Sequence, residues 1–546
     1  MKPKILESGK GFYYLEKSNE KPMLRTILIV LLPLIMASCW EKTVPNMEKT
    51  AASGAYQEPF RPQFHFSPTR GWMNDPNGLV YQDGVYHLFY QYYPDATVWG
   101  PMHWGHAVSE DLVHWQHRPI ALFPDENGLI FSGSAVVDKN NTSGFGKEGK
   151  IPLVAIYTYH SIQGEKTGRN DFQTQGIAFS LDNGETWTKY EGNPVIGNPG
   201  VRDFRDPKVF WHEDTQSWIM ALVVGDHVRF YRSINLKEWQ HLSDFGKGQG
   251  AQGGVWECPD LFPLQVEGTD ETKWVLIISI GSGGPNGGSG TQYFVGDFDG
   301  TTFTPNHEEY KWLDWGTDNY AGVTYNNVPN NDRIFIGWMS NWQYAVLTPT
   351  STWRSAMTLP RKLSLKKFGD DHMVVNYPVE AVFELLAKGQ TQDMVLKAAE
   401  TKEFMHDGLN RSEISFTTET RDFSLALTND KGEHLNVIFD AASDLVIVDR
   451  TRSGLTGFQQ EFGNKLHYMD VKQLPKGLYE VTLLVDAGSV ELFVNRGQFV
   501  MTQQIFPTRP YTKLLIGNTS NSQMELKGFS ISNVASIWDV SKGVLK

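Results

Sequence analysis

The chain has 546 residues, of which 40% are hydrophobic and 20% charged, a balance typical of folded globular proteins rather than disordered ones. Its formal net charge of −13 argues against a nucleic-acid partner, because phosphate binding needs a basic surface. The same charge disfavours an anionic substrate and fits a neutral one.

The N-terminal segment carries an apolar run, residues 27–36, after Arg25. This run has the length of a signal-peptide core and is too short to span a bilayer. It is followed by Ala-Ser-Cys39, and this stretch resembles a bacterial lipoprotein signal, in which the cysteine becomes the lipidated first residue. A plain secretory peptide is the alternative reading.

The lipoprotein reading places the chain outside the cytoplasm. Residues 1–22 are polar and precede the signal, so we predict Met23 as the true start and residues 1–58 as signal segment and linker. The mature protein is then expected on the periplasmic face or the cell surface of a bacterium. A lipid on Cys39 is its only expected link to the membrane.

Residues 59–375 consist almost entirely of short aromatic and β-branched runs separated by Gly, Asn, Asp and Pro clusters, which predicts strands and turns. Three segments share a Ser, an Asp or Asn two residues later, and a closing Trp: Ser109–Trp115, Ser180–Trp187 and Ser233–Trp239. Such a repeat in an all-β chain predicts a five-bladed β-propeller with about four strands a blade. A sandwich with chance turn similarity is the alternative.

The sequence pattern changes after the predicted propeller. Residues 377–388 are the best candidate for a short helix, and residues 390–546 show plain alternation of apolar and polar residues, as in Val481–Val494. This pattern predicts a second domain, a C-terminal β-sandwich.

Three acids lie in similar surroundings: Asp75 in Trp72-Met-Asn-Asp-Pro-Asn-Gly78, Asp206 in Phe204-Arg-Asp-Pro207, and Glu257 in Val255-Trp-Glu-Cys-Pro-Asp260. Each stands at an apolar strand with a proline one or two positions later, which restricts the backbone around the acid. Each also falls in a different predicted blade. Since the first strands of the blades line the central channel, we expect the three acids to meet in one axial pocket.

In this order, the three motifs resemble the signature motifs of glycoside hydrolase family 32, which includes invertases, inulinases and levanases. The resemblance covers about residues 59–535 and extends to Phe131–Ser134, Asn319–Ala321, Gly337–Trp338 and Val485–Asn495. It implies a five-bladed propeller followed by a β-sandwich. It also implies cleavage of β-fructofuranosyl linkages with retention of configuration.

The resemblance gives each acid a role: Asp75 as nucleophile, Glu257 as acid/base and Asp206 as stabiliser of the transition state. It also implies a set of substrate-binding residues, namely Trp72, Asn74, Gln91, Trp99, Phe131, Ser132, Arg205 and Trp338. The expected substrate is a fructan such as levan or inulin, or sucrose. We expect exo action that releases fructose, with no metal and no cofactor.

Three alternatives stay open. The first is endo-cleavage of levan within the same family. The second is a five-bladed arabinan or xylan hydrolase, which inverts configuration and whose motifs lack the full Trp-Met-Asn-Asp-Pro-Asn-Gly and Trp-Glu-Cys-Pro pair. The third is a surface lipoprotein that binds glycans without cleaving them.

Overall fold

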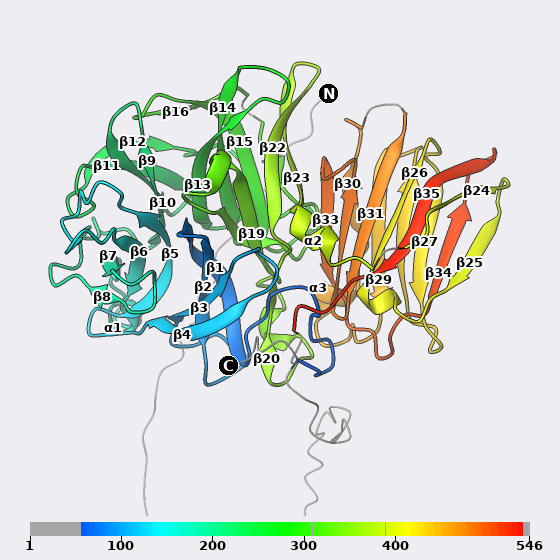
Figure 1. Cartoon of the computed structure of the whole chain (residues 1–546), viewed down its shortest axis with the longest axis horizontal. Coiled ribbons are helices and arrows are strands. Elements are labelled where there is room, and N and C mark those ends of the chain that lie inside the picture. Colours follow the sequence, from blue (N-terminus) through cyan, green and yellow to red (C-terminus); the bar gives the residue numbers. More distant parts are fainter. Residues whose placement is uncertain (1–55, 308, 388, 475–476, 539–546) are drawn as a thin grey trace, which may run out of the picture. The chain divides into compact units, whose positions relative to one another are not determined.

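The computed structural model describes residues 56–307, 309–387, 389–474 and 477–538 (Figure 1). The predicted signal segment, with Met23 and Cys39, lies outside these residues. Among the described residues, no helix has the length and apolar character needed to cross a membrane. The structure confirms the predicted all-β fold: five sheets form a propeller and two more form a sandwich.

The five propeller blades are antiparallel sheets, and in each of them the strand nearest the axis comes first in the chain. Blade I has β1 (Gly71–Gln82), β2 (Val85–Tyr93), β3 (His103–Ser109) and β4 (Gln116–Leu122). Blade II has β5 (Leu129–Val137), β6 (Leu153–His160), β7 (Gln173–Ser180) and β8 (Thr188–Lys189). Blade III has β9 (Phe204–His212), β10 (Ser217–Val224), β11 (His227–Ser233) and β12 (Gln240–Phe245).

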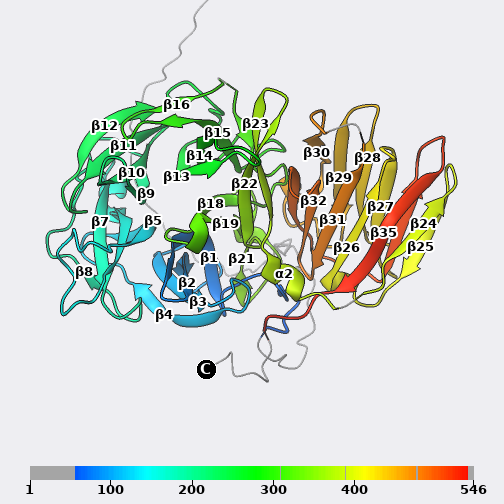
Figure 2. The same ribbon diagram turned by 45° about the horizontal axis from the view of Figure 1, so that its top comes forward.

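Two further blades complete the propeller. Blade IV has β13 (Trp256–Gln265), β14 (Thr272–Ile280), β15 (Gly290–Phe298), β16 (Phe303–Pro305) and β17 (Lys311–Trp312). Blade V has β18 (Tyr320–Thr324), β19 (Arg333–Met339), β22 (Arg361–Phe368), β23 (Asp371–Pro378) and the short β21 (Ala356–Met357). The inner strands β1, β5, β9, β13 and β18 contact one another in a closed ring around the axis (Figure 2).

The ring is closed by contacts between the last blade and the first. Strand β20 (Trp353–Arg354) runs parallel to β1 and pairs with its first two residues. At the other end of β1, the Asn326 backbone exchanges hydrogen bonds with Leu79 and Tyr81. Strand β20 thus adds a late segment of the chain to the sheet of blade I, and these bonds join the start and the end of the propeller.

The repeated Ser-to-Trp segments form the same turn in three blades, between the third strand and the fourth. In each case the serine is the last residue of the third strand, and its hydroxyl accepts hydrogen bonds from backbone N–H groups of the turn. Ser109 accepts from Asp111 and Leu112. Ser180 and Ser233 make the equivalent bonds. The motif therefore recurs because blades I, II and III use the same capped turn.

The C-terminal domain is a sandwich of two six-stranded antiparallel sheets. One sheet has the order β24 (Gln392–Leu396), β35 (Met524–Asn533), β26 (Ser412–Thr418), β31 (Tyr479–Asp486), β32 (Ser489–Val494) and β33 (Phe499–Gln504). The other has the order β25 (Thr401–Met405), β34 (Lys513–Asn518), β27 (Phe423–Thr428), β28 (His434–Asp440), β29 (Leu445–Arg452) and β30 (His467–Asp470). Alternate residues of β28 and β29 are buried, so the period-2 pattern of the sequence marks the inner face.

Helices are few and short. They are α1 (Ile162–Lys166), α2 (Glu380–Glu384) and α3 (Gln460–Gly463), with single 3₁₀ turns η1 (Pro329–Asn331), η2 (Ala345–Leu347) and η3 (Leu409–Arg411). Helix α2 confirms the short helix predicted within residues 377–388. It lies where the chain passes from the last propeller strand into the sandwich.

Two fully buried arginines connect the sandwich to the propeller. Arg361 of blade V pairs with Asp314 and, across the domain boundary, with Glu491 of β32, each at 3.0 Å. Arg450 of the sandwich pairs with Asp318 of the propeller at 2.7 Å. Because buried charges are tolerated only when they are paired, the two domains must stay in contact for these arginines to keep their partners.

Candidate active site

The three acids occupy equivalent places on the inner strands. Asp75 lies in β1, Asp206 in β9 and Glu257 in β13, each close to the start of its strand. Because the inner strands form a ring, their equivalent ends meet at one mouth of the channel (Figure 2).

A β-bulge sits at each of the three acid motifs. In β1 the pairing passes from Met73 opposite Tyr92 to Pro76 opposite Tyr90, so two residues, one of them Asp75, face a single partner residue. The same shift places Asp206 and Pro207 in a bulge of β9, and Cys258 and Pro259 in a bulge of β13.

The bulges explain why turn residues stand inside strands. A bulge leaves a residue unpaired, so a proline without an N–H group is tolerated there. Asp206 and Cys258 also adopt positive φ angles of 65° and 47°, which non-glycine residues rarely do outside constrained sites. The bulges take Asp75 and Asp206 out of the regular pleat, and Glu257 directly precedes the bulge of β13.

The acids line a cavity of about 240 Å³ at the mouth of the channel, which we call the axial cavity. Its walls include the following predicted residues: Asn74, Asp75, Gln91, Trp99, Phe131, Ser132, Arg205, Asp206 and Glu257. The structure thus brings together the three acids and six of the eight predicted substrate-binding residues.

The other two, Trp72 and Trp338, are fully buried and do not reach the cavity surface. They lie behind Trp342, which does line the cavity, with ring centroids 6.0 and 4.8 Å from that of Trp342. Trp342 follows β19, in the same stretch as Trp338. Trp338 in the strand is buried, whereas Trp342, four positions later in the loop, faces the cavity. The sequence pattern did not predict which of the two tryptophans lines the cavity.

Asp75 is held by a chain of hydrogen bonds. Trp72 Nε1 donates to Asn74 Oδ1 at 2.7 Å, and Asn74 Nδ2 donates to Asp75 Oδ1 at 3.0 Å. Ser132 Oγ donates to the other oxygen, Oδ2, at 2.6 Å. Both carboxylate oxygens of Asp75 therefore have a fixed donor, and the buried indole of Trp72 orients the amide that supplies one of them.

The pKa of Asp75 reflects burial against these donors. Burial, and then the negative charge of Glu257, raise the pKa of the Asp75 carboxyl, while the hydrogen bonds from Ser132 and Asn74 act to lower it. The donors favour the charged form, which is the form that acts as a nucleophile.

Glu257 lies between a cation and a phenol. Arg205 donates to Glu257 Oε1 from Nε at 3.2 Å and from Nη2 at 3.0 Å. The hydroxyl of Tyr320 donates to the other oxygen, Oε2. Burial and the charge of Glu257 raise the pKa of Tyr320 well above its usual value, so the phenol keeps its proton and remains a donor.

Asp206 is more enclosed than Glu257: its side chain is 4% exposed, against 22% for that of Glu257. The Cys258 backbone N–H donates to Asp206 Oδ2 at 3.1 Å, and Arg205 Nε lies 4.0 Å from the same oxygen. Burial raises the pKa of the Asp206 carboxyl; the positive charge of Arg205 opposes this rise, and Glu257 and Asp75 add to it.

Cys258 is buried among the acids. Its Sγ lies 3.6 Å from Asp75 Oδ2 and 3.7 Å from Asp206 Oδ2. Burial, together with the negative charges of Asp75 and Asp206, raises the pKa of the thiol well above its usual value. A neutral thiol at this place is a weak donor to two carboxylates and a poor nucleophile.

Aromatic and charged side chains form the outer wall. Trp99 packs edge-on against Phe131 at 6.0 Å, and Phe131 stacks on His160 at 4.2 Å. His160 and Arg202 both contact Glu165, each at 3.1 Å. Sequence reasoning did not single out His160, Arg202, Asp203, Gln173, Tyr320 or Trp342. Of these only Tyr320 stood in a stretch that the sequence had marked, Asn319–Ala321.

The chemistry available in the axial cavity follows from these contacts. A carboxylate fixed by two neutral donors faces the same space as a carboxyl group between an arginine and a protonated phenol. A third buried acid stands beside both. Among the described residues, no group of three or more His, Cys, Asp or Glu side chains is arranged to hold a metal ion. A carboxylate nucleophile and a carboxylic acid are the pair that glycoside hydrolysis uses.

Comparison with known proteins agrees with this geometry. The model for the glycosyl hydrolases family 32 N-terminal domain matches residues 65–378, and that for the family 32 C-terminal domain matches residues 383–534. A levanase of Bacillus subtilis is 45% identical over 89% of this chain and 72% of its own. An extracellular exo-inulinase of Aspergillus awamori is 41% identical over 89% of this chain and 96% of its own.

Solved structures show the same architecture. The crystal structure of exo-inulinase from Aspergillus awamori has a TM-score of 0.81 at 40% identity, covering 88% of this chain and all of that one. A fructofuranosidase variant from Schwanniomyces occidentalis, complexed with fructosylnystose, has a TM-score of 0.79 at 33% identity, covering 89% and 99%. Both family models together span the propeller and the sandwich, and the chain therefore belongs to glycosyl hydrolase family 32.

Proposed function

We propose that this protein is a retaining glycosidase that cleaves β-fructofuranosyl linkages of fructans such as levan and inulin, and of sucrose. It is proposed to act from chain ends and to release fructose. The observation that carries the proposal is the meeting of Asp75, Asp206 and Glu257 in one cavity, each from a bulged inner strand. Relatives named levanase and exo-inulinase support the choice of substrate.

In the first step, Asp75 attacks C2 of the terminal fructosyl unit while Glu257 protonates the departing oxygen. The hydrogen bonds from Ser132 and Asn74 keep both oxygens of Asp75 in place for this attack. The result is a fructosyl ester on Asp75. In the second step, Glu257 takes a proton from water, which attacks C2, releases fructose and frees Asp75.

Asp206 does not form a bond in this scheme. Its negative charge is proposed to stabilise the positive charge that develops on the fructosyl ring in both steps. Arg205 contacts Glu257 and lies near Asp206, so it is proposed to orient both acids rather than to transfer a proton.

The remaining cavity residues are proposed to hold the sugar. Gln91 and the Asn74 amide present polar groups to the hydroxyls, and the exposed indole of Trp99 presents a flat apolar face. Trp342 is proposed to take the wall position that the sequence had assigned to Trp72 and Trp338. Relatives named exo-inulinase support exo action.

The protein is also proposed to act outside the cytoplasm, attached to a bacterial membrane through a lipid on Cys39. The support is the lipoprotein-like stretch that ends at Cys39 and the relationship to an extracellular exo-inulinase. Labelling the cells with a radioactive fatty acid tests the anchor. We expect the wild-type protein to take up the label and the Cys39→Ala protein to remain unlabelled.

The decisive experiment incubates purified protein with levan, inulin and sucrose and resolves the products over time. Fructose as the sole early product of the polymers is expected, whereas a ladder of oligosaccharides identifies endo action. In 10% methanol, the methyl fructoside formed must have the β configuration if the mechanism retains. Binding of all three glycans without cleavage, or an α product, contradicts the proposal.

A further inference from the structure

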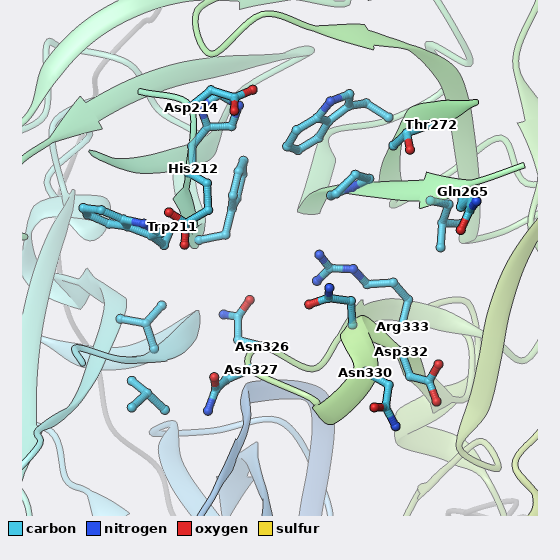
Figure 3. Close-up of a pocket in the computed structure, with 18 of the residues that line it drawn as sticks. Trp211, His212, Asp214, Gln265, Thr272, Asn326, Asn327, Asn330, Asp332 and Arg333 are labelled. Carbon is cyan, nitrogen blue, oxygen red and sulfur yellow. The ribbon is translucent and has the colours of Figure 1, made fainter. Parts of the chain in front are cut away.

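A second cavity, larger than the first, opens at the opposite end of the propeller channel. It has a volume of about 880 Å³, within the range of ligand-binding pockets. Its walls come from the far ends of the inner strands of blades II, III and IV and from the segment after β18 of blade V. We call it the far cavity; Figure 3 shows Trp211, His212, Gln265, Asn326, Asn327 and Arg333 around it.

The far cavity is separate from the axial cavity. His212 stands six residues after Asp206 along β9, which corresponds to roughly 20 Å of strand. Between the two levels, the channel is filled by a buried ion pair, with Lys208 Nζ 3.1 Å from Asp260 Oδ2. Thr324 of β18 donates to the same carboxylate oxygen through N–H and Oγ1. A ligand in one cavity therefore does not reach the other through the axis.

Aromatic rings form one wall of the far cavity, and their neighbours hold them in place. Trp211 packs edge-on against Trp218 with centroids 5.1 Å apart. Trp274 packs against Phe210 at 5.7 Å and against His212 at 5.6 Å. Trp211, Phe210 and Trp274 are only partly buried, so fixed apolar faces remain open to a ligand. Rigid rings of this kind bind flat faces at low entropic cost.

The other wall is polar and contains an unpartnered donor. Arg333 extends its guanidinium into the cavity (Figure 3). Within the described part of the chain, its buried Nε has no hydrogen-bond acceptor. A buried donor without an acceptor costs free energy, and the guanidinium that reaches the cavity carries further N–H groups that can donate to a ligand. The amides of Asn327, Asn331 and Gln265 surround the same space.

The charges of the far cavity select the kind of ligand. The two cations, Lys139 and Arg333, are outnumbered by three acids, Glu213, Asp214 and Asp332. No cationic patch is therefore present among these described residues that would select phosphate or another anion. Aromatic faces together with amide, carboxylate and guanidinium groups fit a neutral polyhydroxyl compound, whose hydroxyls both donate and accept.

We propose that the far cavity is a second carbohydrate-binding site, which holds a neutral fructan chain away from the bond that is cut. The identity of the glycan rests on the proposed function; the site itself rests on the cavity, its aromatic wall and Arg333. A polymer held there raises the local concentration of chain ends near the axial cavity. Sucrose is too short to span the two cavities and gains nothing from it.

Affinity electrophoresis tests the site. The protein carries Asp75→Asn so that the glycan is not consumed, and it migrates through gels that contain levan, inulin or dextran. Trp211→Ala and Arg333→Gln are each added to this background. Tyr310→Ala removes an exposed aromatic ring from the edge of blade IV and serves as the control. Thermal unfolding midpoints show whether each variant is folded.

Each far-cavity variant is expected to bind levan or inulin about fivefold more weakly than the Asp75→Asn parent, while the control binds as the parent does and dextran retards none of them. Equal retardation of the parent and both folded variants overturns the proposal. Failure of the proposed function is seen separately, as absence of fructan cleavage by the wild-type protein. If retardation still depends on Trp211 and Arg333 in that case, the binding site stands without the hydrolase.

Discussion

Arg205 donates two hydrogen bonds to one oxygen of Glu257, from Nε at 3.2 Å and from Nη2 at 3.0 Å. Its third nitrogen, Nη1, binds Asp203 at 2.6 Å, so the guanidinium is fixed from the opposite side. Burial acts to lower the pKa of Arg205, but Glu257, Asp206 and Asp203 outweigh it and raise that pKa. The guanidinium is therefore a permanent positive charge between two of the three acids.

Removal of this charge is expected to impair catalysis and to change its pH dependence. Arg205→Gln is predicted to lower kcat/KM by about 10- to 100-fold, the range for a lost hydrogen bond to a charged group. Arg205 lowers the pKa of Asp206, so its loss raises that pKa and the acid limb of the pH profile moves to higher pH. Arg229→Gln removes an arginine that pairs with Asp244 at the surface. This control is expected to leave the profile unchanged, and an unshifted acid limb in Arg205→Gln contradicts the assignment.

Ser132 offers a second test by pH. Its hydroxyl lowers the pKa of Asp75 by donating to Oδ2. In Ser132→Ala the pKa of Asp75 rises further, so the ionised nucleophile appears only at higher pH. The acid limb of kcat/KM is expected to move up by about 1 pH unit.

The matched control for Ser132 is two residues away on the same strand. Ser134 Oγ donates to the backbone of Pro207 and, among the described residues, makes no hydrogen bond to an acid. Ser134→Ala is expected to change stability without shifting the acid limb. A shift of equal size in both variants shows that Ser132 acts through packing and not through Asp75.

Cys258 is predicted to be unreactive in the folded protein. The thiol is buried, and its pKa is raised well above the usual value, so little thiolate forms at neutral pH. Incubation with iodoacetamide at pH 7.5, followed by mass spectrometry of the peptide that contains Cys258, is expected to show no label. The same peptide is labelled after unfolding in guanidinium chloride. Rapid labelling of Cys258 in the folded protein, with loss of activity, contradicts the prediction that this thiol is unreactive.

The contact between propeller and sandwich is predicted to be a large source of stability. Arg361→Met leaves the buried carboxylate of Asp314 without its cation and leaves that of Glu491 with His65 alone. Breaking a buried ion pair in this way typically costs about 3–5 kcal/mol, so the thermal unfolding midpoint is expected to fall by several degrees. Lys362→Met is the neighbouring control, since Lys362 is exposed and pairs only with Asp332 among the described residues. Equal midpoints for the two variants disagree with this account.

The fold and the three acids were accessible from the sequence because both repeat. Five blades need five inner strands with similar ends, and the capped turn at Ser109, Ser180 and Ser233 marks the period. The acids were found because a proline follows each of them, and the structure links each motif to a bulge: Pro207 and Pro259 lie in bulges, and Pro76 directly follows one.

The parts that the sequence did not reveal depend on packing across blades. Trp72 and Trp338 carried the signal of a sugar-binding wall, yet both are buried, and the loop residue Trp342 faces the cavity instead. Tyr320 comes from blade V and meets Glu257 of blade IV because the inner strands of these two neighbouring blades pack side by side. The far cavity likewise joins residues from four blades that share no local motif.

The most direct test of the account compares fructan hydrolysis by Asp75→Asn, Glu257→Gln and the control Asp83→Asn, whose residue lies exposed in the turn after β1. The two active-site variants are predicted to lose about 1,000-fold or more of kcat on levan and inulin, while Asp83→Asn keeps wild-type activity. Hydrolysis by a folded Asp75→Asn or Glu257→Gln protein within tenfold of wild type contradicts the central claim.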